Sequence, residues 1–235
     1  MPVYGIDLGT TYSAIAKLNE NNMPIIIQNV EEGSFTLPSA VYFPEDSSDI
    51  TVGREAKAAA ASEPERVFQH VKRYIGKDMP EEELAKLRRI GKSNENPITI
   101  SSYILKRMIQ YANEQGEAVE DAVITCPAYF NNEQREATRQ AGILAGLNVL
   151  DIVNEPTAAA IYHCHNLEAE NQKILVYDLG GGTFDVTVID MIKGDGDQLT
   201  IDAMGTAGND ELGGIDWDKK LYEYILQEYS AVRGY

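Results

Sequence analysis

Two segments far apart in this chain carry nearly the same pattern of residues. In the first, the apolar stretch 3–6 leads into Asp7-Leu8-Gly9-Thr10-Thr11; in the second, the stretch 174–177 leads into Asp178-Leu179-Gly180-Gly181-Gly182-Thr183. Each segment then resumes as another β-prone run. The pattern predicts two β-hairpins whose tips expose backbone N–H groups, hydroxyls and one carboxylate. Two such tips facing each other would hold a polyphosphate and its metal ion between them.

The N-terminal half of the sequence changes from strand patterns to helix patterns. We expect a helical pattern over 54–92 and then a helix capped by Ser101 or Ser102. A second helix, at about 133–146, begins with a capping-box pattern of Asn131 and Gln134. A third helix is expected to begin near Pro156. The strands are expected at 3–8, 13–18, 25–28, 37–43, 121–126 and 148–153.

The C-terminal part repeats the beginning of the chain. After a polar link at 166–172, the sequence predicts a meander with a turn at 194–197 and then a last helix. A second set of strands in the same order suggests an internal duplication whose second copy is cut short. The strands are expected at 173–178, 184–189 and 198–205, and one face of the helix carries Trp217, Leu221, Tyr224 and Ile225.

Charge and cysteine content limit the kinds of partner. The net charge is −17, from 20 basic and 37 acidic residues, which argues against a nucleic-acid surface because such surfaces need clustered Lys and Arg. Nucleotide binding is compatible with this negative net charge, because backbone amides and a divalent cation supply positive charge locally. Two cysteines allow at most one disulfide, and no apolar run reaches about 18–20 residues. Because a basic segment followed by an apolar one is missing near residue 1, we expect no signal peptide. We therefore expect a cytoplasmic protein without nucleic-acid or membrane partners.

Three aspartates at strand ends are candidate magnesium ligands. Asp7, Asp178 and Asp185 stand beside the two glycine-containing turns, and Mg²⁺ prefers oxygen ligands while it keeps part of its water shell. A single Asp-Gly turn more often hydrogen-bonds to itself. Two matching turns, each with threonine hydroxyls, favour phosphate and metal binding over that alternative.

Lys72, Arg73 and Glu155 have two interpretations on sequence alone. Lys72 and Arg73 lie in the expected helical stretch and are more simply explained as solvated charges, although a lysine directed into an acidic pocket would offset phosphate charge. Glu155 precedes Pro156 at a helix start, where an acid is favourable, but it is also placed for an outer-shell contact with Mg²⁺ or water.

Five segments together resemble the seventy-kilodalton heat-shock chaperones of DnaK type, and they keep the family's order from end to end. They are Gly5-Ile6-Asp7-Leu8-Gly9-Thr10-Thr11-Tyr12-Ser13, Val71-Lys72-Arg73, Pro127-Ala128-Tyr129-Phe130-Asn131, Asn154-Glu155-Pro156-Thr157-Ala158-Ala159-Ala160 and Asp178-Leu179-Gly180-Gly181-Gly182-Thr183-Phe184-Asp185. Leu212-Gly213-Gly214 with Asp216-Trp217-Asp218 is similar to the family's Leu-Gly-Gly-x-Asp-Phe-Asp segment.

The resemblance implies an α/β actin-like ATPase fold with two ribonuclease-H-like lobes and ATP with Mg²⁺ in the cleft between them. Residues 1–170 would form a complete first lobe, with a shortened inserted subdomain at about 31–100, and residues 171–235 a truncated second lobe. The family's adenosine-contact segment, interdomain linker and peptide-binding domain would lie beyond residue 235. In a full-length protein the partners would be that peptide-binding domain, a J-domain co-chaperone and a nucleotide exchange factor.

The resemblance also implies roles for individual residues. The nucleotide would be bound by Asp7, Gly9, Thr10, Thr11, Tyr12, Gly180, Gly181, Gly182 and Thr183. The catalytic residues would be Lys72, Glu155, Asp178, Thr183 and Asp185, while Asp7 and Asp178 would hold Mg²⁺ through water and Glu155 would lie in its outer shell. Pro127 and Arg135 would relay the nucleotide state to the peptide-binding domain.

Three functions remain open from the sequence. The first is the N-terminal ATPase portion of a chaperone that assists protein folding, also under stress. The second is a non-catalytic regulatory or interaction module with the same fold. The third is an actin-like small-molecule kinase, from which the matches at 127–131 and 154–160 point away.

Overall fold

The largest sheet carries both the first hairpin and the parallel strands that follow it. The computed structural model describes residues 2–165, 171–193 and 199–233. The sheet has the order β3-β2-β1-β8-β9, with β4 attached to β2; β1 is antiparallel to β2 and parallel to β8, which is parallel to β9. The hairpin expected at Asp7 is therefore confirmed. The strands are β1 Val3–Asp7, β2 Tyr12–Leu18, β3 Pro24–Ile26, β4 Leu37–Pro38, β8 Asp121–Cys126 and β9 Asn148–Asn154.

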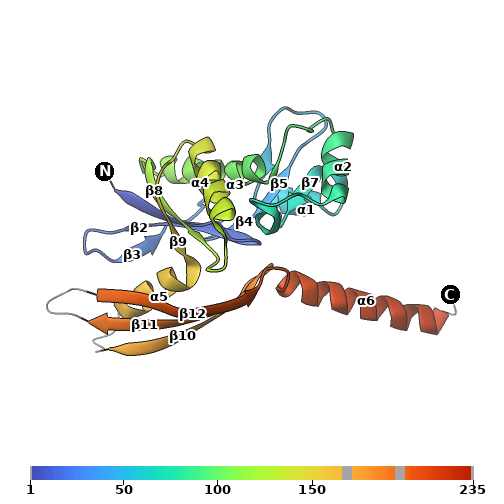
Figure 1. The fold of residues 1–235 in the computed structure, drawn as a ribbon. Coiled ribbons are helices and arrows are strands. Elements are labelled where there is room, and N and C mark those ends of the chain that lie inside the picture. The colour runs from blue at the N-terminus through green and yellow to red at the C-terminus, as the bar shows by residue number, and fades with distance from the viewer. Residues whose placement is uncertain (1, 166–170, 194–198, 234–235) are drawn as a thin grey trace.

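The main hydrophobic core lies on one face of this sheet. Residues alternate along β1, so Tyr4 and Ile6 are buried while Val3 and Asp7 are exposed. The helices α3 (Pro97–Asn113) and α4 (Asn132–Leu144) cover the buried face (Figure 1). Each of these helices makes the crossover between two parallel strands, which fixes the ends of β1, β8 and β9 at one edge of the sheet.

A small second sheet and its helices replace the single helical stretch expected over 54–92. This sheet has the order β6-β5-β7, and β7 pairs with β5 through Ala40↔Gln69. Lys72 and Arg73 lie on a 3₁₀ turn that follows a left-handed His70 (φ 60°), so the α-helix expected there was wrong. The elements are β5 Ala40–Tyr42, β6 Thr51–Val52, α1 Arg54–Ala59, η1 Pro64–Arg66, β7 Val67–Gln69, η2 Val71–Tyr74 and α2 Glu81–Arg89.

The strand expected over 37–43 is divided between two sheets at Ser39. The N–H of Ser39 donates to the carbonyl of Thr11 at 2.9 Å, and its hydroxyl donates to the carbonyl of Gly9 at 2.8 Å. Ser39 therefore supports the turn between β1 and β2 instead of continuing a ladder.

Two helices, α3 and α4, begin with capping boxes, but only that of α4 lies at the predicted position. The box predicted for α4 is confirmed, because Asn131 accepts from the N–H of Gln134 and the Gln134 side chain accepts in return. The cap expected at Ser101 or Ser102 was wrong: α3 begins earlier, at an Asn96 cap with Pro97 in the first turn. Both serines lie inside the helix, where the Ser102 hydroxyl donates to the carbonyl of Thr99 at 2.7 Å.

The third sheet is the expected meander, in the order β10-β11-β12. Its first two strands pair as a hairpin with Asp178 opposite Asp185, and β12 continues to Asn209, beyond the predicted end at 205. Helix α5 (Glu155–His165), which begins at the predicted place, lies between this sheet and the first one (Figure 1). The predicted turn at 194–197 and most of the link at 166–172 lie outside the described residues. The strands are β10 Gln172–Leu179, β11 Phe184–Lys193 and β12 Leu199–Asn209.

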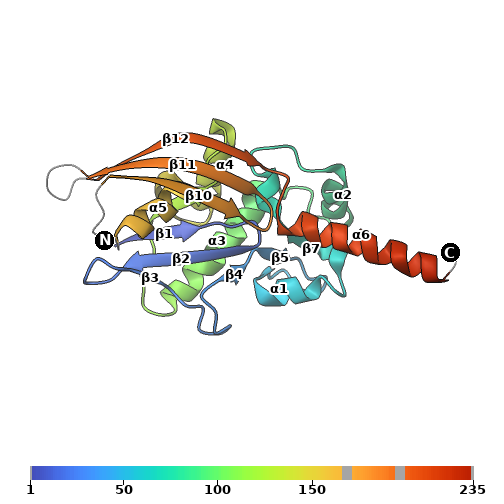
Figure 2. The same cartoon turned by 90° about the horizontal axis from the view of Figure 1, so that it is seen from below.

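Helix α6 (Gly214–Arg233) starts beside the turn between β10 and β11 and extends away from the sheets (Figure 2). No residue of this helix is buried, and its predicted apolar face is exposed to solvent, with Trp217 at 63%. Only the first turn of α6 therefore lies close to the region between the hairpins.

Candidate functional site

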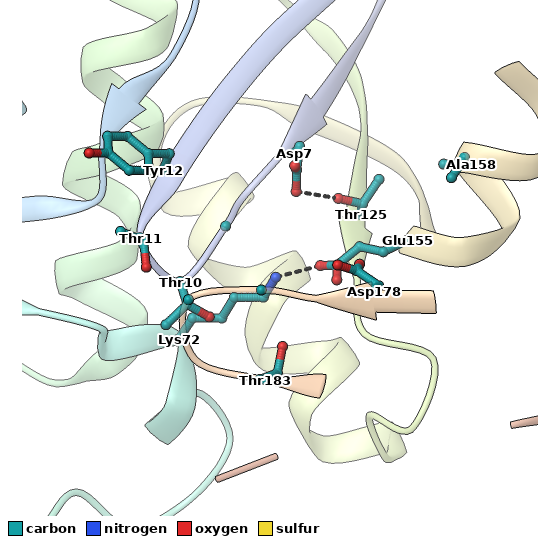
Figure 3. A pocket seen from close by; sticks show the side chains of 14 residues that line it. Asp7, Thr10, Thr11, Tyr12, Lys72, Thr125, Glu155, Ala158, Asp178 and Thr183 are labelled. Carbon is teal, nitrogen blue, oxygen red and sulfur yellow. Dashed lines mark hydrogen bonds and ion pairs between the residues drawn. The ribbon is translucent and has the colours of Figure 1, made fainter. Parts of the chain in front are cut away.

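A cavity of about 450 Å³ lies between the turns of the two hairpins. The β1–β2 turn forms one wall, and residues 180–183, which we name the glycine turn, form the other (Figure 3). Gly9 and Gly181 thus share one cavity although they are far apart in sequence. The lining residues are Asp7, Gly9, Thr10, Thr11, Tyr12, Lys72, Thr125, Glu155, Ala158, Ala159, Asp178, Gly180, Gly181 and Thr183.

The two turns touch each other, and this contact requires glycine. A Cβ atom on Gly181 would overlap the hydroxyl of Thr11, and one on Gly182 would overlap the methyl group of Thr10. Gly182 does not line the cavity but packs behind Thr10. The hydroxyl of Thr11 is buried and has no partner among the described residues, so it is available to a bound group.

The glycine turn presents three unpaired backbone N–H groups. The carbonyls of Gly180, Gly181 and Gly182 accept from the N–H of Gly214 (3.0 Å), the N–H of Ile215 (3.0 Å) and Nε of Arg73 (2.9 Å). In a trans peptide the next N–H points opposite to the carbonyl. The N–H groups of residues 181 and 182 therefore point away from α6, that of Thr183 points away from Arg73, and no described residue accepts from any of the three. Successive N–H groups of this kind form an anion-binding nest.

Among the described residues that line the cavity, Lys72 alone supplies an ammonium group. It is only 7% exposed, and its Nζ donates to Oε1 of Glu155 at 2.5 Å (Figure 3). Burial alone would lower the pKa of Lys72, but the carboxylates of Glu155 and Asp7 outweigh it and raise that pKa. Lys72 is therefore held as a cation that faces the cavity.

The carboxylates around Lys72 outnumber it. Burial, together with repulsion from Asp7, raises the pKa of both Glu155 and Asp178. Asp7 also accepts a hydrogen bond from Thr125 at 3.0 Å (Figure 3). This excess of negative charge favours binding of a further cation.

Magnesium fits this donor set when it keeps part of its water shell. Among the described residues no three acidic, His or Cys side chains converge closely enough to ligate a metal directly. Asp7, Asp178 and Glu155 nevertheless offer the oxygen ligands that Mg²⁺ prefers, and bound phosphate oxygens and waters normally complete its coordination. The orphaned Thr11 hydroxyl and the nest of N–H groups fit the phosphates.

Asp185 lies behind the cavity rather than in its lining. It is 2% exposed, and its Oδ1 has no hydrogen-bond partner among the described residues. Burial, with repulsion from Glu155 and Asp178, raises its pKa to about 7. A proton at this position is therefore gained and lost near neutral pH.

This shift predicts a pH-dependent effect of Asp185→Asn on stability. The pKa of Asp185 is higher in the folded chain than its ordinary 3.8, so the stability that this group provides is complete below about pH 4 and is lost as the pH rises through 7. We expect the variant to raise the melting temperature of the nucleotide-free protein at pH 8 by about 5 °C, with a smaller rise at pH 5 and little change below pH 4. Asp202→Asn, at an exposed position of β12, should have no such effect, and equal melting of wild type and Asp185→Asn at pH 8 would contradict the assignment.

Pro127 and Arg135, the two residues expected to act as a relay, lie outside the cavity. Arg135 donates to the carbonyls of Phe130 (3.0 Å) and Ala128 (3.3 Å) and to Oδ1 of Asn154 (2.5 Å). Pro127 is buried at the start of the same loop. Arg135 thus connects this loop to the residue before Glu155.

Two contributors were missed by the sequence interpretation. Thr125 lies near the end of β8 beside Asp7, which the parallel pairing Ile6↔Ile124 brings about. Two polar residues near the ends of neighbouring apolar strands were the available signal. Arg73 was considered only as a solvated charge, but it contacts the glycine turn.

The two facing hairpin turns, carried by two separate sheets in a mixed α/β chain, are consistent with the class of α/β proteins that have an actin-like lobe. A sequence model of the family described as Hsp70 protein matches residues 3–235, and the chain therefore belongs to the Hsp70 family. The predicted family and fold class are confirmed.

Proteins named chaperone protein DnaK are similar over nearly the whole chain. Those of Thermotoga neapolitana, Thermotoga maritima and Thermosipho africanus are 44%, 43% and 42% identical over 233 residues. Each comparison covers 99% of this chain and 37% of the relative, so the chain spans little more than a third of the relatives' length. The kinase alternative is not favoured by these matches. Within the described residues, no helix is long and apolar enough to span a bilayer.

Proposed function

We propose that this chain binds ATP with Mg²⁺ in the cavity and hydrolyses the terminal phosphate, as the nucleotide-binding part of a molecular chaperone. The observation that carries the proposal is the arrangement of three unpaired N–H groups opposite a buried ammonium in an acidic wall. The similarity to proteins named chaperone protein DnaK supports the chaperone assignment.

The residues divide the work by position. The N–H groups of the glycine turn, with Thr10, Thr11 and Thr183, bind phosphate oxygens, while Lys72 stabilises the charge that develops on the transferred group. Asp7, Asp178 and Glu155 hold Mg²⁺, which when bound neutralises phosphate charge. Tyr12 lies at the edge of the cavity, where its hydroxyl accepts from Lys57 at 3.0 Å.

The buried carboxyl groups are the candidates to accept the proton of the attacking water. Glu155 is held by Lys72, and Asp185 changes its protonation near pH 7. A carboxyl with such a pKa is suited to accept the proton of the attacking water at neutral pH. Because Asp185 does not line the cavity, it would receive this proton through a bridging water.

The wider assignments follow from the same proposal. In a longer protein, Pro127 and Arg135 would relay the nucleotide state to a peptide-binding domain. A J-domain co-chaperone and a nucleotide exchange factor would act on the cycle of ATP binding and hydrolysis. Such a chaperone would also assist protein folding under stress. We place the chain in the cytoplasm, which the free thiol of buried Cys126 supports because such thiols are typical of reducing compartments.

Ligand-induced stabilisation tests nucleotide binding directly. We expect Mg·ATP at about 100 times its Kd to stabilise the fold by about 2.7 kcal/mol, which raises the melting temperature by about 5–10 °C. ATP with EDTA, Mg²⁺ alone and Mg·tripolyphosphate separate the roles of the metal, the phosphates and the adenosine. No rise at millimolar Mg·ATP would instead support a non-catalytic regulatory or interaction module.

A further inference from the structure

Arg73 connects the 3₁₀ turn η2 to the glycine turn and to the start of α6, whereas its neighbour Lys72 faces the cavity. Both residues belong to the short 3₁₀ turn η2, but the Arg73 side chain runs to the glycine turn and to the first turn of α6. Nε donates to the carbonyl of Gly182 at 2.9 Å, while the two terminal nitrogens bind Asp216, one of them at 3.3 Å. The side chain is largely buried in this position.

Asp216 completes the connection from the other side. Its Oδ2 also accepts from the N–H of Gly213 at 2.9 Å, so one carboxylate joins Arg73 to the start of α6. The hydrogen bond from Arg73 lowers the pKa of Asp216, which keeps the pair ionised at neutral pH. A negative group in the first turn is also favoured by the helix dipole.

These contacts account for the orientation of the glycine turn. Three consecutive carbonyls are held on the α6 side, two by the N–H groups of Gly214 and Ile215 and the third by Arg73. Arg73 is the only one of these donors that comes from the first part of the chain. Without it the peptide between Gly182 and Thr183 loses its fixed direction, and the third N–H group of the nest is free to rotate, because glycine has little intrinsic preference.

We infer that Arg73 is a positioning residue that fixes the glycine turn against the start of α6 and thereby aims its N–H groups at the bound phosphates. The same 3₁₀ turn thus supplies an ammonium to the cavity through Lys72 and a clamp to the opposite wall through Arg73. The effect on nucleotide affinity rests on the proposed function, whereas the clamp itself is a property of the nucleotide-free protein.

The test compares Arg73→Ala with Lys77→Ala in the nucleotide-free chain and with Mg·ATP. Lys77 is a matched control because it also forms an ion pair across the two parts of the chain, with Asp210, but does not touch the glycine turn. In Arg73→Ala we expect amide hydrogen exchange at Gly214 and Ile215 to become about tenfold faster. We expect Mg·ATP binding to weaken by at least about tenfold, with no comparable change in Lys77→Ala.

Asp216→Asn provides a second route to the same contact, since it removes the charge and keeps the shape. It should speed exchange at Gly214 and Ile215 in the same way. This variant decides the question if Arg73→Ala does not fold. Exchange in both variants within twofold of wild type, or an equal change in Lys77→Ala, would overturn the clamp. A wild-type chain that does not bind Mg·ATP would refute the proposed function, while the exchange measurement would still decide the role of Arg73.

Discussion

Replacing Lys72 by methionine is expected to reduce single-turnover phosphate release from bound Mg·ATP by at least about a hundredfold. Methionine keeps the length of the side chain and its packing but removes the ammonium that faces the cavity. The loss of a preorganised charge affects the transition state more than the ground state. The rate at saturating nucleotide should therefore fall far more than the affinity, as single-turnover release and equilibrium binding will show.

The same substitution is expected to destabilise the nucleotide-free protein, and more so at high pH. Removing one partner of a buried ion pair typically costs about 3–5 kcal/mol. Glu155 can partly avoid this cost by taking up a proton, because burial and the neighbouring Asp7 already raise its pKa. The destabilisation should consequently grow as the pH rises, and thermal melting at pH 6 and pH 8 measures it.

Lys17→Met is the matched control for this experiment. Lys17 also pairs with a glutamate, Glu117, in a partly buried contact between β2 and the segment that follows α3, outside the cavity. We expect a modest loss of stability without a change in phosphate release per bound nucleotide. Unchanged release in Lys72→Met would contradict the role given to this lysine.

The hairpins were predictable because their signal is local. A β-prone run, an aspartate, glycine and a second β-prone run specify a hairpin within about a dozen residues, and the pairs Asp7↔Ala14 and Asp178↔Asp185 follow. The capping box at Asn131 is local in the same sense. The sequence also placed matching turns on two hairpins, from which a shared site was a reasonable inference.

The segment that carries Lys72 was not predictable from its own residues. Apolar residues at 67, 71, 74 and 75 suit a helix, yet Val67–Gln69 forms a strand because β5, some 27 positions earlier, offers a free edge to pair with. The left-handed His70 then turns the chain into η2. The direction of Lys72 thus depends on a tertiary contact that helical periodicity does not contain.

The remaining parts of the site depend on pairs that are remote in sequence. Arg73 meets Asp216 across 143 positions, and Thr125 meets Asp7 across 118. No pattern in the sequence pairs Arg73 with Asp216, and only the polar residues near the ends of two apolar strands point to the second pair. Asp185, on the strand after the glycine turn, was expected in the site both from its position beside that turn and from the resemblance, and only the packing shows that it is buried behind the lining.

Gly213→Ala is expected to disrupt the junction between α6 and the glycine turn. A Cβ atom on Gly213 would lie 2.5 Å from both the carbonyl carbon of Gly181 and the nitrogen of Gly182. These are backbone atoms and cannot rotate away, so the glycine turn itself must shift. Overpacking of this kind costs about 1–3 kcal/mol, which corresponds to a fall in melting temperature of about 3–10 °C.

The larger effect of this substitution should fall on nucleotide binding. A shift of the glycine turn breaks the hydrogen bonds from Gly214 and Ile215 that hold its carbonyls away from the cavity, and the nest of N–H groups loses its aim. We expect the stabilisation by Mg·ATP to disappear. Gly205→Ala is the matched control, because a Cβ atom there has no neighbour within 4 Å, so both melting temperature and ligand response should stay near wild type. A full Mg·ATP response in Gly213→Ala would mean that the contact between α6 and the glycine turn does not orient the phosphate-binding groups.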